Sequence, residues 1–570
     1  MKYTLALWLL FLSLLLAACG GGEAGVSPSP TLAPTPVPVT PTPLPENATT
    51  GAHIRARGYL VVGVRYDLRP FGYVTDEGEV AGFGVDVGHE LARRWLGDET
   101  AVQFRQVRSD TAIERLQAGD VDLVVAALAH TQGGEAGADF SLPYFYDGQA
   151  LLMRQADAAG ITGPLDLEGR PIGVVAWDEA QSALWDAVPF TPTLQTYDRF
   201  DEAVAALGQG EVEAVADMRH RLFWGTEMFP GTVIVGQYTS ATPVAIAFPQ
   251  NDPFFADLVN LTFQEMVGDG AYADLYGRWF GPEQPPAVER WPGDEVPALA
   301  DAPVTTDVPD TIGAIQTRGR LAVALVSGHA PFAYADPDGL SAGYEVGLAR
   351  LLAAQWLGDG AAVDFYPTTA EAGQEMLRTG QADLLIGGLV HTRAAEMEMD
   401  FSLTTYLDGE GLLVQAGTVV TDLNSLGGQQ VAAVADSESG EILLAAARQA
   451  GAALTVLPQP TLEAAAALLG EGRVVAVAGD RADLLGLAYA APELEVLAFR
   501  LTQKPLALAL PPGDSAFRDL VNLTLQTLKA NGQFDALYAS WFDDAPPALE
   551  IWPGAPYRSL KLEIAAPPEG

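Results

Sequence analysis

Cysteine is nearly absent from this sequence, because Cys19 is the only one among 570 residues. A disulfide bond within the chain is therefore excluded, and thiol catalysis and cysteine-based metal sites are not expected. Positive charge is scarce as well: 31 lysines and arginines face 73 aspartates and glutamates, and the net charge is −42. A chain of that charge repels phosphates, which excludes a general nucleic-acid-binding protein.

Only one long apolar run is present, at Leu5–Leu16, between Lys2 and Ala17-Ala18-Cys19. A short positive end, an apolar stretch of this length and small residues before a cut site indicate an export signal rather than a membrane span. The Leu-Ala-Ala-Cys ending resembles the bacterial lipobox, which implies a signal peptide over residues 1–19 and lipidation of Cys19. An ordinary signal peptide with an incidental cysteine is the alternative. An acyl chain on Cys19 would tether the protein to a membrane surface.

Three segments have the composition of connecting chain. Residues 20–50 consist largely of Gly, Ser, Thr and Pro, which favours extended polyproline geometry at roughly 3 Å per residue. We expect this segment to be a disordered stalk. Residues 282–311 are rich in Pro, Ala and acids and are predicted to be a linker, and residues 544–570 form a tail.

The rest of the chain contains one pattern twice. His130–Phe145 reads HTQGGEAGADFSLPYF and His391–Tyr406 reads HTRAAEMEMDFSLTTY. Thr131 therefore matches Thr392 at a displacement of 261 residues (392 − 131 = 261). The same offset holds over most of the first half of each repeat, which indicates a duplicated domain rather than a set of short repeats.

Within each copy, short apolar runs alternate with helical patterns. In copy 1, Leu60–Val64 is a predicted buried strand, Val87–Trp95 a predicted helix with one apolar face, and Val244–Phe248 a predicted returning strand. This order predicts an α/β fold, with two lobes per copy and a mostly parallel sheet flanked by helices in each lobe. The predicted boundaries are residues 51–281 for copy 1 (lobe 1 at 51–150 and 243–281, lobe 2 at 151–242) and residues 312–543 for copy 2 (lobe 1 at 312–411 and 505–543, lobe 2 at 412–504).

Several short motifs recur in the same order in both copies. In copy 1 they are Pro70-Phe71, Gly82-Phe83 with Asp86, Gly119–Leu123, Asp139-Phe140-Ser141 and Asp166-Leu167. Together these motifs resemble bacterial extracellular solute-binding proteins of family 3, over residues 54–280 and again over residues 315–542. The resemblance implies a tandem pair of type 2 periplasmic-binding-protein domains, whose lobes close on a small solute that an ABC permease then receives.

Capture of an amino acid needs a guanidinium and helix-end N–H groups for the carboxylate, an acid for the ammonium and an apolar wall for the side chain. The family resemblance implies an arginine three residues after Thr131 and Thr392, but Gly134 and Ala395 stand there. Arg393 is a candidate to reach inward, and a surface arginine is the alternative. The missing clamps indicate that the ligand is not a plain α-amino acid, or that one copy is degenerate.

For the ammonium, the resemblance implies an acid after the second-lobe strand. Asp480 stands there in copy 2, and Asp217 comes one residue early in copy 1; each could instead cap the following helix. Trp177-Asp178 and Asp436-Ser437 mark the expected helix starts of the second lobes. An aspartate at these starts is expected to satisfy the free N–H groups, so that a carboxylate ligand would bind worse.

Aromatic and polar residues complete the candidate site. Trp177 is expected as a stacking wall or as a cover of the hinge, and Glu345 is the candidate substitute for Asp86 in copy 2. Phe71 and Phe332 fit the lobe core better than Tyr73 and Tyr334 do. The predicted ligand-binding residues are Tyr66, Phe71, Tyr73, Asp86, Thr131, Trp177, Asp217, His329, Phe332, Tyr334, Glu345, Thr392, Arg393, Ser437 and Asp480.

Neither a metal nor a cofactor is expected. His130 and His391 precede the motif threonines, but no second ligand follows at metal-binding spacing. An enzyme is not expected either. Cyclohexadienyl-dehydratase-like proteins share the fold, but their carboxylated substrate would need the absent arginine, and the sequence shows no nucleophile–base pair.

The sequence therefore predicts a lipid-anchored, extracytoplasmic protein that captures a small polar organic solute, amino-acid-like or cationic, for an ABC importer. The alternative is a degenerate tandem module that senses a solute, or contacts another envelope protein, without transport.

Overall fold

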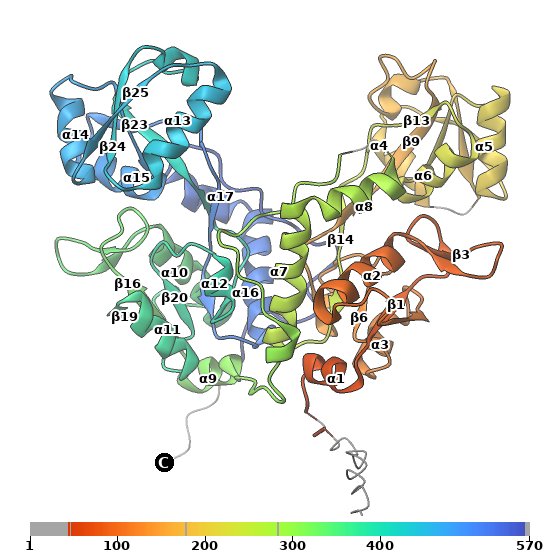
Figure 1. Ribbon diagram of the computed structural model, residues 1–570, viewed down its shortest axis with the longest axis horizontal. Helices are drawn as coiled ribbons and strands as arrows, with labels where there is room; N and C mark the ends of the chain where they lie inside the picture. The colour runs from red at the N-terminus through yellow and green to blue at the C-terminus, as the bar shows by residue number, and fades with distance from the viewer. Residues whose placement is uncertain (1–43, 46, 177–178, 282–283, 565–570) are drawn as a thin grey trace, which may run out of the picture. The chain divides into compact units, whose positions relative to one another are not determined.

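The computed structural model of the chain describes residues 44–45, 47–176, 179–281 and 284–564 (Figure 1). Cys19 and Trp177, with its neighbour Asp178, lie outside these described residues. No helix in the described ranges is long and apolar enough to cross a membrane.

Lobe 1 of copy 1 is built on a five-stranded sheet with the order β5-β1-β6-β15-β7. Strand β1 pairs in parallel with β5 and β6, and β15 runs antiparallel to β6 and β7. All five residues of β1 are buried, as expected of an apolar strand inside a largely parallel sheet. The elements of this lobe are α1 (Thr50–Arg57), β1 (Leu60–Val64), β2 (Asp67–Leu68), β3 (Gly72–Val74), β4 (Val80–Ala81), α2 (Phe83–Leu96), β5 (Val102–Gln106), α3 (Ala112–Gln117), β6 (Leu123–Val124), a short 3-10 turn (Gly134–Ala136), β7 (Asp139–Phe140), β15 (Ala247–Phe248), α7 (Pro253–Asp269) and α8 (Ala271–Phe280).

Lobe 2 of copy 1 has a second five-stranded sheet, with the order β11-β10-β12-β9-β13. Here β10 is parallel to β11 and β12, while β9 is antiparallel to β12 and β13. Its elements are β9 (Gln149–Arg154), a 3-10 turn (Pro164–Leu167), β10 (Pro171–Val175), α4 (Glu179–Ala187), β11 (Thr193–Tyr197), α5 (Phe200–Gln209), β12 (Ala214–Met218), α6 (Arg219–Met228) and β13 (Thr232–Val235).

A two-stranded antiparallel hinge, β8 (Phe145–Asp147) with β14 (Thr242–Val244), connects the two lobes. The prediction of one strand over Val244–Phe248 is therefore wrong. β14 ends in the hinge at Val244, and β15 begins in the lobe 1 sheet at Ala247. An apolar run shows that a segment is buried, but it does not show that the chain changes sheets inside the run.

Copy 2 repeats this arrangement, with sheets β19-β16-β20-β29-β21 and β25-β24-β26-β23-β27 and the hinge pair β22-β28. Its lobe 1 contains α9 (Thr311–Arg318), β16 (Leu321–Val326), β17 (Tyr334–Ala335), β18 (Ser341–Ala342), α10 (Tyr344–Leu357), β19 (Val363–Thr368), α11 (Ala370–Arg378), β20 (Leu384–Ile386), α12 (Arg393–Glu396), β21 (Asp400–Phe401), β29 (Ala509–Leu510), α16 (Ser515–Ala530) and α17 (Gln533–Ala539). Its hinge and lobe 2 contain β22 (Tyr406–Asp408), β23 (Glu410–Gln415), a 3-10 turn (Leu423–Leu426), β24 (Gln430–Val434), α13 (Glu438–Ala450), β25 (Thr455–Gln459), α14 (Leu462–Gly470), β26 (Ala476–Asp480), α15 (Arg481–Ala490), β27 (Leu494–Val496) and β28 (Lys504–Leu506).

The described part of the predicted linker, residues 284–311, makes hydrogen bonds with copy 1. It contains a 3-10 turn (Leu299–Asp301), and its Val304 carbonyl accepts a hydrogen bond from the Thr49 N–H at 2.9 Å. The Arg55 guanidinium donates to the carbonyls of Ala300 and Ala302 at 2.7 and 2.9 Å. The linker is thus fixed to the first helix of copy 1.

Candidate functional site

In copy 2, three charged side chains meet where the hinge joins lobe 2. Lys504 begins β28, Glu410 begins β23 and Asp480 ends β26, and Glu410 lies opposite Asp480 in the sheet register. The Lys504 Nζ lies 2.5 Å from the Asp480 Oδ2 and 3.2 Å from the Glu410 Oε1. The ammonium of this lysine therefore neutralises part of the negative charge of the two carboxylates.

Asp408, at the end of β22, adds a fourth ionisable group. Its burial, together with the neighbouring Asp480, raises the pKa of Asp408 to about 9. For Asp480, burial is outweighed by hydrogen bonds with Asp408 and Lys504, so the pKa of Asp480 is lowered. At neutral pH, Asp408 is consequently a neutral acid that donates a hydrogen bond to an ionised Asp480.

The first turn of α13 lies at the carboxyl end of β24 and has free N–H groups. Its N-cap residue is Ser437, whose side chain does not cap the helix; its Oγ instead donates to the Val434 carbonyl at 2.8 Å. Asp436 is exposed and has a left-handed backbone with φ of 61°. The expectation that Asp436 satisfies the helix start is therefore wrong, because the left-handed residue precedes the cap. The N–H groups of α13 remain available to an anion.

Lys504, Glu410, Asp480 and the start of α13 line one cavity of about 370 Å³ at lobe 2 of copy 2. The volume falls in the range of pockets that hold small organic ligands. The cavity is lined by Glu410, Val434, Ser437, Glu438, Ser439, Leu462, Gly479, Asp480, Asp483 and Lys504. It combines a helix start that attracts anions, acids that attract cations and one lysine, which suits a ligand that carries both charges.

Two tyrosines meet across the lobes of copy 2. The hydroxyl groups of Tyr334 in lobe 1 and Tyr489 on α15 in lobe 2 lie 2.7 Å apart. His329 is exposed in the loop before Tyr334, and its Nδ1 lies 2.8 Å from the Gly387 carbonyl. Tyr334 and His329 therefore lie on the side of lobe 1 that approaches lobe 2.

Glu345 and Phe332 are fully buried in lobe 1 of copy 2. One Glu345 oxygen accepts hydrogen bonds from the N–H groups of Gly387 and Gly388 at 2.6 and 2.8 Å. Burial raises the pKa of Glu345 to about 7. Phe332 packs against Tyr406 and Phe542. The structure thus places Glu345 under a backbone turn and Phe332 in an aromatic core.

The same positions in copy 1 carry uncharged side chains. The strand register pairs Gln149 with Met218 in copy 1 as it pairs Glu410 with Asp480 in copy 2. Thr242 stands opposite Asp147 in the copy 1 hinge, as Lys504 stands opposite Asp408. The Gln149 Nε2 donates to the Met218 Sδ at 3.2 Å. The acid–acid–lysine set of copy 2 is therefore an amide, a thioether and a hydroxyl in copy 1.

Asp217 points away from this position in copy 1. It is fully buried, and its Oδ1 lies 3.1 Å from the Arg221 Nη1 and accepts the Met218 N–H at 2.7 Å. Side chains alternate between the two faces of a strand, so a residue one place early lies on the opposite face. The structure places Met218, not Asp217, at the position equivalent to Asp480.

Four predicted residues of copy 1 are held by contacts within lobe 1. The Asp86 Oδ2 accepts hydrogen bonds from Arg278 and from the Trp279 indole at 2.6 and 2.9 Å. The Arg69 guanidinium lies 3.7 Å from the centre of the Tyr73 ring. Phe71 is buried among Phe83, Tyr144, Phe145 and Phe280, and the Tyr66 hydroxyl donates to the Phe104 carbonyl at 3.3 Å.

The motif threonines cap their own turns. The Thr131 Oγ1 accepts from the Gly134 N–H at 3.0 Å, and the Thr392 Oγ1 accepts from the Ala395 N–H at 3.1 Å. Arg393 is 5% exposed, and its N–H donates to the Pro292 carbonyl in the linker at 2.9 Å. The structure therefore places Arg393 against the linker.

The residues that sequence reasoning missed are Lys504 and Glu410 in copy 2 and Gln149, Met218 and Thr242 in copy 1. A signal was present, because Ala214–Met218 reads AVADM and Ala476–Asp480 reads AVAGD. Aligned without a gap, these strands give a displacement of 262 residues (480 − 218 = 262) and put Met218 opposite Asp480. In the part of the chain that the structure describes, no group of three or more metal-ligating side chains is arranged to hold an ion.

Two lobes on a two-stranded hinge, with a polar cavity at the carboxyl end of lobe 2 strands, define a two-lobed solute-binding protein. The chain belongs to the bacterial extracellular solute-binding proteins, family 3, whose model matches residues 60–282 and again residues 321–544. Membership in this family implies a location outside the cytoplasm.

Among curated relatives, the ABC transporter glutamine-binding protein of Bacillus subtilis is 29% identical over 282 residues, which cover 49% of this chain and 96% of that protein. The glutamine-binding protein of Geobacillus stearothermophilus is 31% identical over 196 residues, which cover 34% of this chain and 73% of the relative. Among solved structures, an ancestral cationic amino acid solute-binding protein is 27% identical with a TM-score of 0.37, over 41% of this chain and all of that chain. These relatives are binding proteins by name.

Proposed function

We propose that this chain is a lipid-anchored extracytoplasmic receptor that captures a small polar organic solute, amino-acid-like or cationic, and delivers it to an ABC importer. In this proposal residues 1–19 are a lipoprotein signal ending at Cys19, and the two solute-binding copies occupy residues 51–281 and 312–543. The stalk predicted over residues 20–50 ends before Ala48, because Ala48 pairs with Thr305, Thr49 is buried and α1 begins at Thr50. Capture takes place between the two lobes of a copy.

The observation that carries the proposal is the cavity of about 370 Å³ in copy 2. A ligand carboxylate fits the free N–H groups at the start of α13, where the helix dipole is positive. A ligand ammonium fits the Asp480 and Glu410 carboxylates, which Lys504 neutralises only in part. An amino acid or a close analogue carries both groups, and two relatives are named glutamine-binding proteins, so glutamine is the first ligand to test.

The two copies do not have the same ligand in this proposal. The Gln149–Met218–Thr242 set of copy 1 carries no charge, so it cannot hold an ammonium as the copy 2 acids do. A neutral or weakly polar solute fits copy 1 better. The chain would then present two specificities to the importer.

Calorimetric titration of the full chain with glutamine, glutamate, arginine and polyamines tests copy 2. Asp480→Asn should weaken binding of the responding amino acid by at least about tenfold, the usual cost of removing a charged partner of a buried ammonium. Glu493→Gln, at an exposed acid of the same lobe, is the matched control and should leave the affinity unchanged. Equal affinities for Asp480→Asn and the parent chain would remove Asp480 from the site.

The second candidate is a degenerate tandem module that senses a solute, or contacts an envelope protein, without transport. It is favoured by Gly134 and Ala395, which replace the expected arginine in both copies. Absence of any binding response to the whole panel, with an intact fold by circular dichroism, would favour this candidate.

A further inference from the structure

The segments that follow each copy are exchanged between the copies. We call residues 287–293 strap 1 and residues 548–554 strap 2. Trp291 of strap 1 stacks on His391 of copy 2 with ring centres 3.9 Å apart, and Trp552 of strap 2 stacks on His130 of copy 1 at 4.1 Å. The two copies thus meet through a reciprocal contact, as in a two-fold symmetric dimer.

A cavity of about 510 Å³ lies at this seam and is lined by both copies and both straps. Most of the ionisable and aromatic residues that line it come in pairs, with one member from each half of the chain. These pairs are His130 and His391, Glu135 and Glu396, Phe140 and Phe401, Glu289 and Glu550, and Trp291 and Trp552. Nothing in this cavity belongs to the solute cleft described above.

Two strap carboxylates face the cavity with only neutral donors as hydrogen-bond partners. Glu550 accepts from the Tyr146 hydroxyl at 2.9 Å and from its own strap's Trp552 indole at 3.0 Å. Glu289 accepts from the Thr404 hydroxyl at 2.7 Å and from the Trp291 indole at 3.1 Å. The pKa of Tyr146 is raised by burial and by the charges of both Glu550 and Glu289. The two carboxylates therefore both affect the same tyrosine hydroxyl group.

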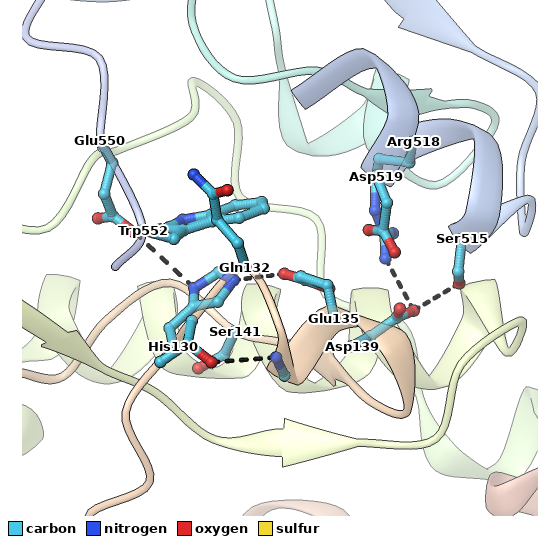
Figure 2. Close-up of polar contacts among 12 residues, drawn as sticks. His130, Gln132, Glu135, Asp139, Ser141, Ser515, Arg518, Asp519, Glu550 and Trp552 are labelled. Atoms are coloured by element: carbon cyan, nitrogen blue, oxygen red, sulfur yellow. Dashed lines mark hydrogen bonds and ion pairs between the residues drawn. The ribbon is translucent and has the colours of Figure 1, made fainter. Parts of the chain in front are cut away.

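The inner wall holds a buried polar atom that points toward Glu550 (Figure 2). His130 is 5% exposed, its Nε2 contacts Glu135, and its Nδ1 has no hydrogen-bond partner and lies 3.8 Å from the Glu550 Oε1. Burial lowers the pKa of His130 to about 4 and raises the pKa of Glu135 to about 8. The pair is consequently uncharged at neutral pH and does not neutralise Glu550.

Arg518 is the one lysine or arginine among the described residues that line the cavity. Its charge is already paired with two buried carboxylates. Its guanidinium lies 2.8 Å from Asp139 (Figure 2) and 3.4 Å from Asp400. The cavity therefore has unneutralised negative charge on both straps, with indole and imidazole rings between the straps and the copies. No cluster of ligating side chains in the described residues fits a metal ion.

We propose that the seam cavity binds a small organic diamine, with one ammonium group at Glu289 and the other at Glu550. A diamine matches two paired carboxylates on opposite straps, and its methylene chain suits the aromatic walls. A primary ammonium at Glu550 also lies against the Tyr146 hydroxyl oxygen, which accepts a hydrogen bond. Because each carboxylate belongs to a different strap, the ligand ties the two straps together and stabilises the contact between the copies.

Titration of the full chain with 1,4-diaminobutane, followed by calorimetry and by thermal unfolding, tests the proposal. Binding with a raised melting temperature is expected, and 1-aminobutane should bind at least about tenfold more weakly because it fills one carboxylate only. Glu550→Gln and Glu289→Gln should each weaken diamine binding by a similar factor. Glu289 is exposed, so its variant is expected to fold even if Glu550→Gln does not.

Two controls separate this site from other sources of amine binding. The exposed-acid variant Glu493→Gln should leave diamine affinity unchanged, and an equal loss there would mean general attraction to an acidic surface. If Asp480→Asn abolishes diamine binding while both strap variants retain it, the diamine binds in the copy 2 cleft. Either result, or no binding of diamine by the parent chain, overturns the seam site. Glutamine binding is measured in the same strap variants. If it is retained, the proposed function stands whether or not the seam site is overturned.

Discussion

Replacement of Arg518 by alanine removes the cation that lies between two buried acids. Arg518 lies on α16 and contacts Asp139 of copy 1 and Asp400 of copy 2, whose side chains are 2% and 7% exposed. The aligned residue on α7 is Ala256, because the two helices match at a displacement of 262 residues (518 − 256 = 262). One arginine therefore balances the charge of one acid from each copy. In the variant Arg518→Ala, neither acid has this cation.

The expected loss is about 3–5 kcal/mol in the free energy of unfolding, the usual cost of removing one partner of a buried ion pair. The loss should grow with pH, because burial already raises the pKa of Asp400 to about 7 while Arg518 opposes the rise. Without Arg518 the pKa of Asp400 rises further, and ionisation in the folded state becomes more costly. Urea denaturation at pH 6 and pH 8, monitored by tryptophan fluorescence, measures both effects.

The matched control is Arg378→Ala, which removes an exposed arginine paired with Glu375 on the same helix turn. A surface pair of this kind contributes little. The combined variant Arg518→Ala/Asp139→Asn/Asp400→Asn should recover most of the loss, because the neutral amides need no cation. A cost of Arg518→Ala no larger than that of the control, or no recovery from the two asparagines, would show that Arg518 does not balance these acids.

Three further predictions concern the buried acids, the strap contact and the copy 2 cavity. Stability should fall as pH rises from 5 to 8, because Glu135 and Asp400 have folded pKa values of about 8 and about 7, above their unfolded values. Over this range the folded state therefore holds protons that the unfolded state has already released. Each contributes at most about 1.4 kcal/mol per pH unit, and a flat melting temperature across the range would contradict it. Trp552→Ala, at a ring that is 4% exposed, should cost about 3–5 kcal/mol and speed amide exchange in copy 1 near residue 130; unchanged exchange there would argue against the strap contact. Lys504→Thr, which gives copy 2 the residue of copy 1, should raise the affinity for arginine at least about tenfold by freeing two carboxylates, and a lower affinity would show that the lysine itself holds the ligand.

The helices were the part of the fold that the sequence predicted best. The predicted helix Val87–Trp95 lies inside α2 (Phe83–Leu96), whose C-cap residue Gly97 has a left-handed φ of 75°. Its apolar spacing and its terminal glycine are local signals. The chain passes from the hinge to the lobe 1 sheet between Val244 and Ala247 because it pairs there with strands distant in the sequence. The apolar run itself contains no local signal of this change.

Of the residues that line the copy 2 cavity, Asp480 and Ser437 were predicted from the sequence, but Lys504 was not. Asp480 was predicted from the second-lobe strand, and it lines the copy 2 cavity. Its partner Lys504 comes from the returning hinge strand, and only the pairing of β28 with β22 brings it there. The exchanged straps were missed although the sequence carries a signal, since Trp291-Pro292-Gly293 recurs as Trp552-Pro553-Gly554 (552 − 291 = 261).

Because the straps are exchanged, copy 1 can complete its contacts only after most of copy 2 has been synthesised. His130 receives its stacking partner from a residue made 422 positions later (552 − 130 = 422). A ribosome synthesises a chain at about 5–20 residues per second, and domains usually fold as they emerge. Copy 1 therefore waits for tens of seconds with the His130 face uncovered, until Trp552 has been synthesised.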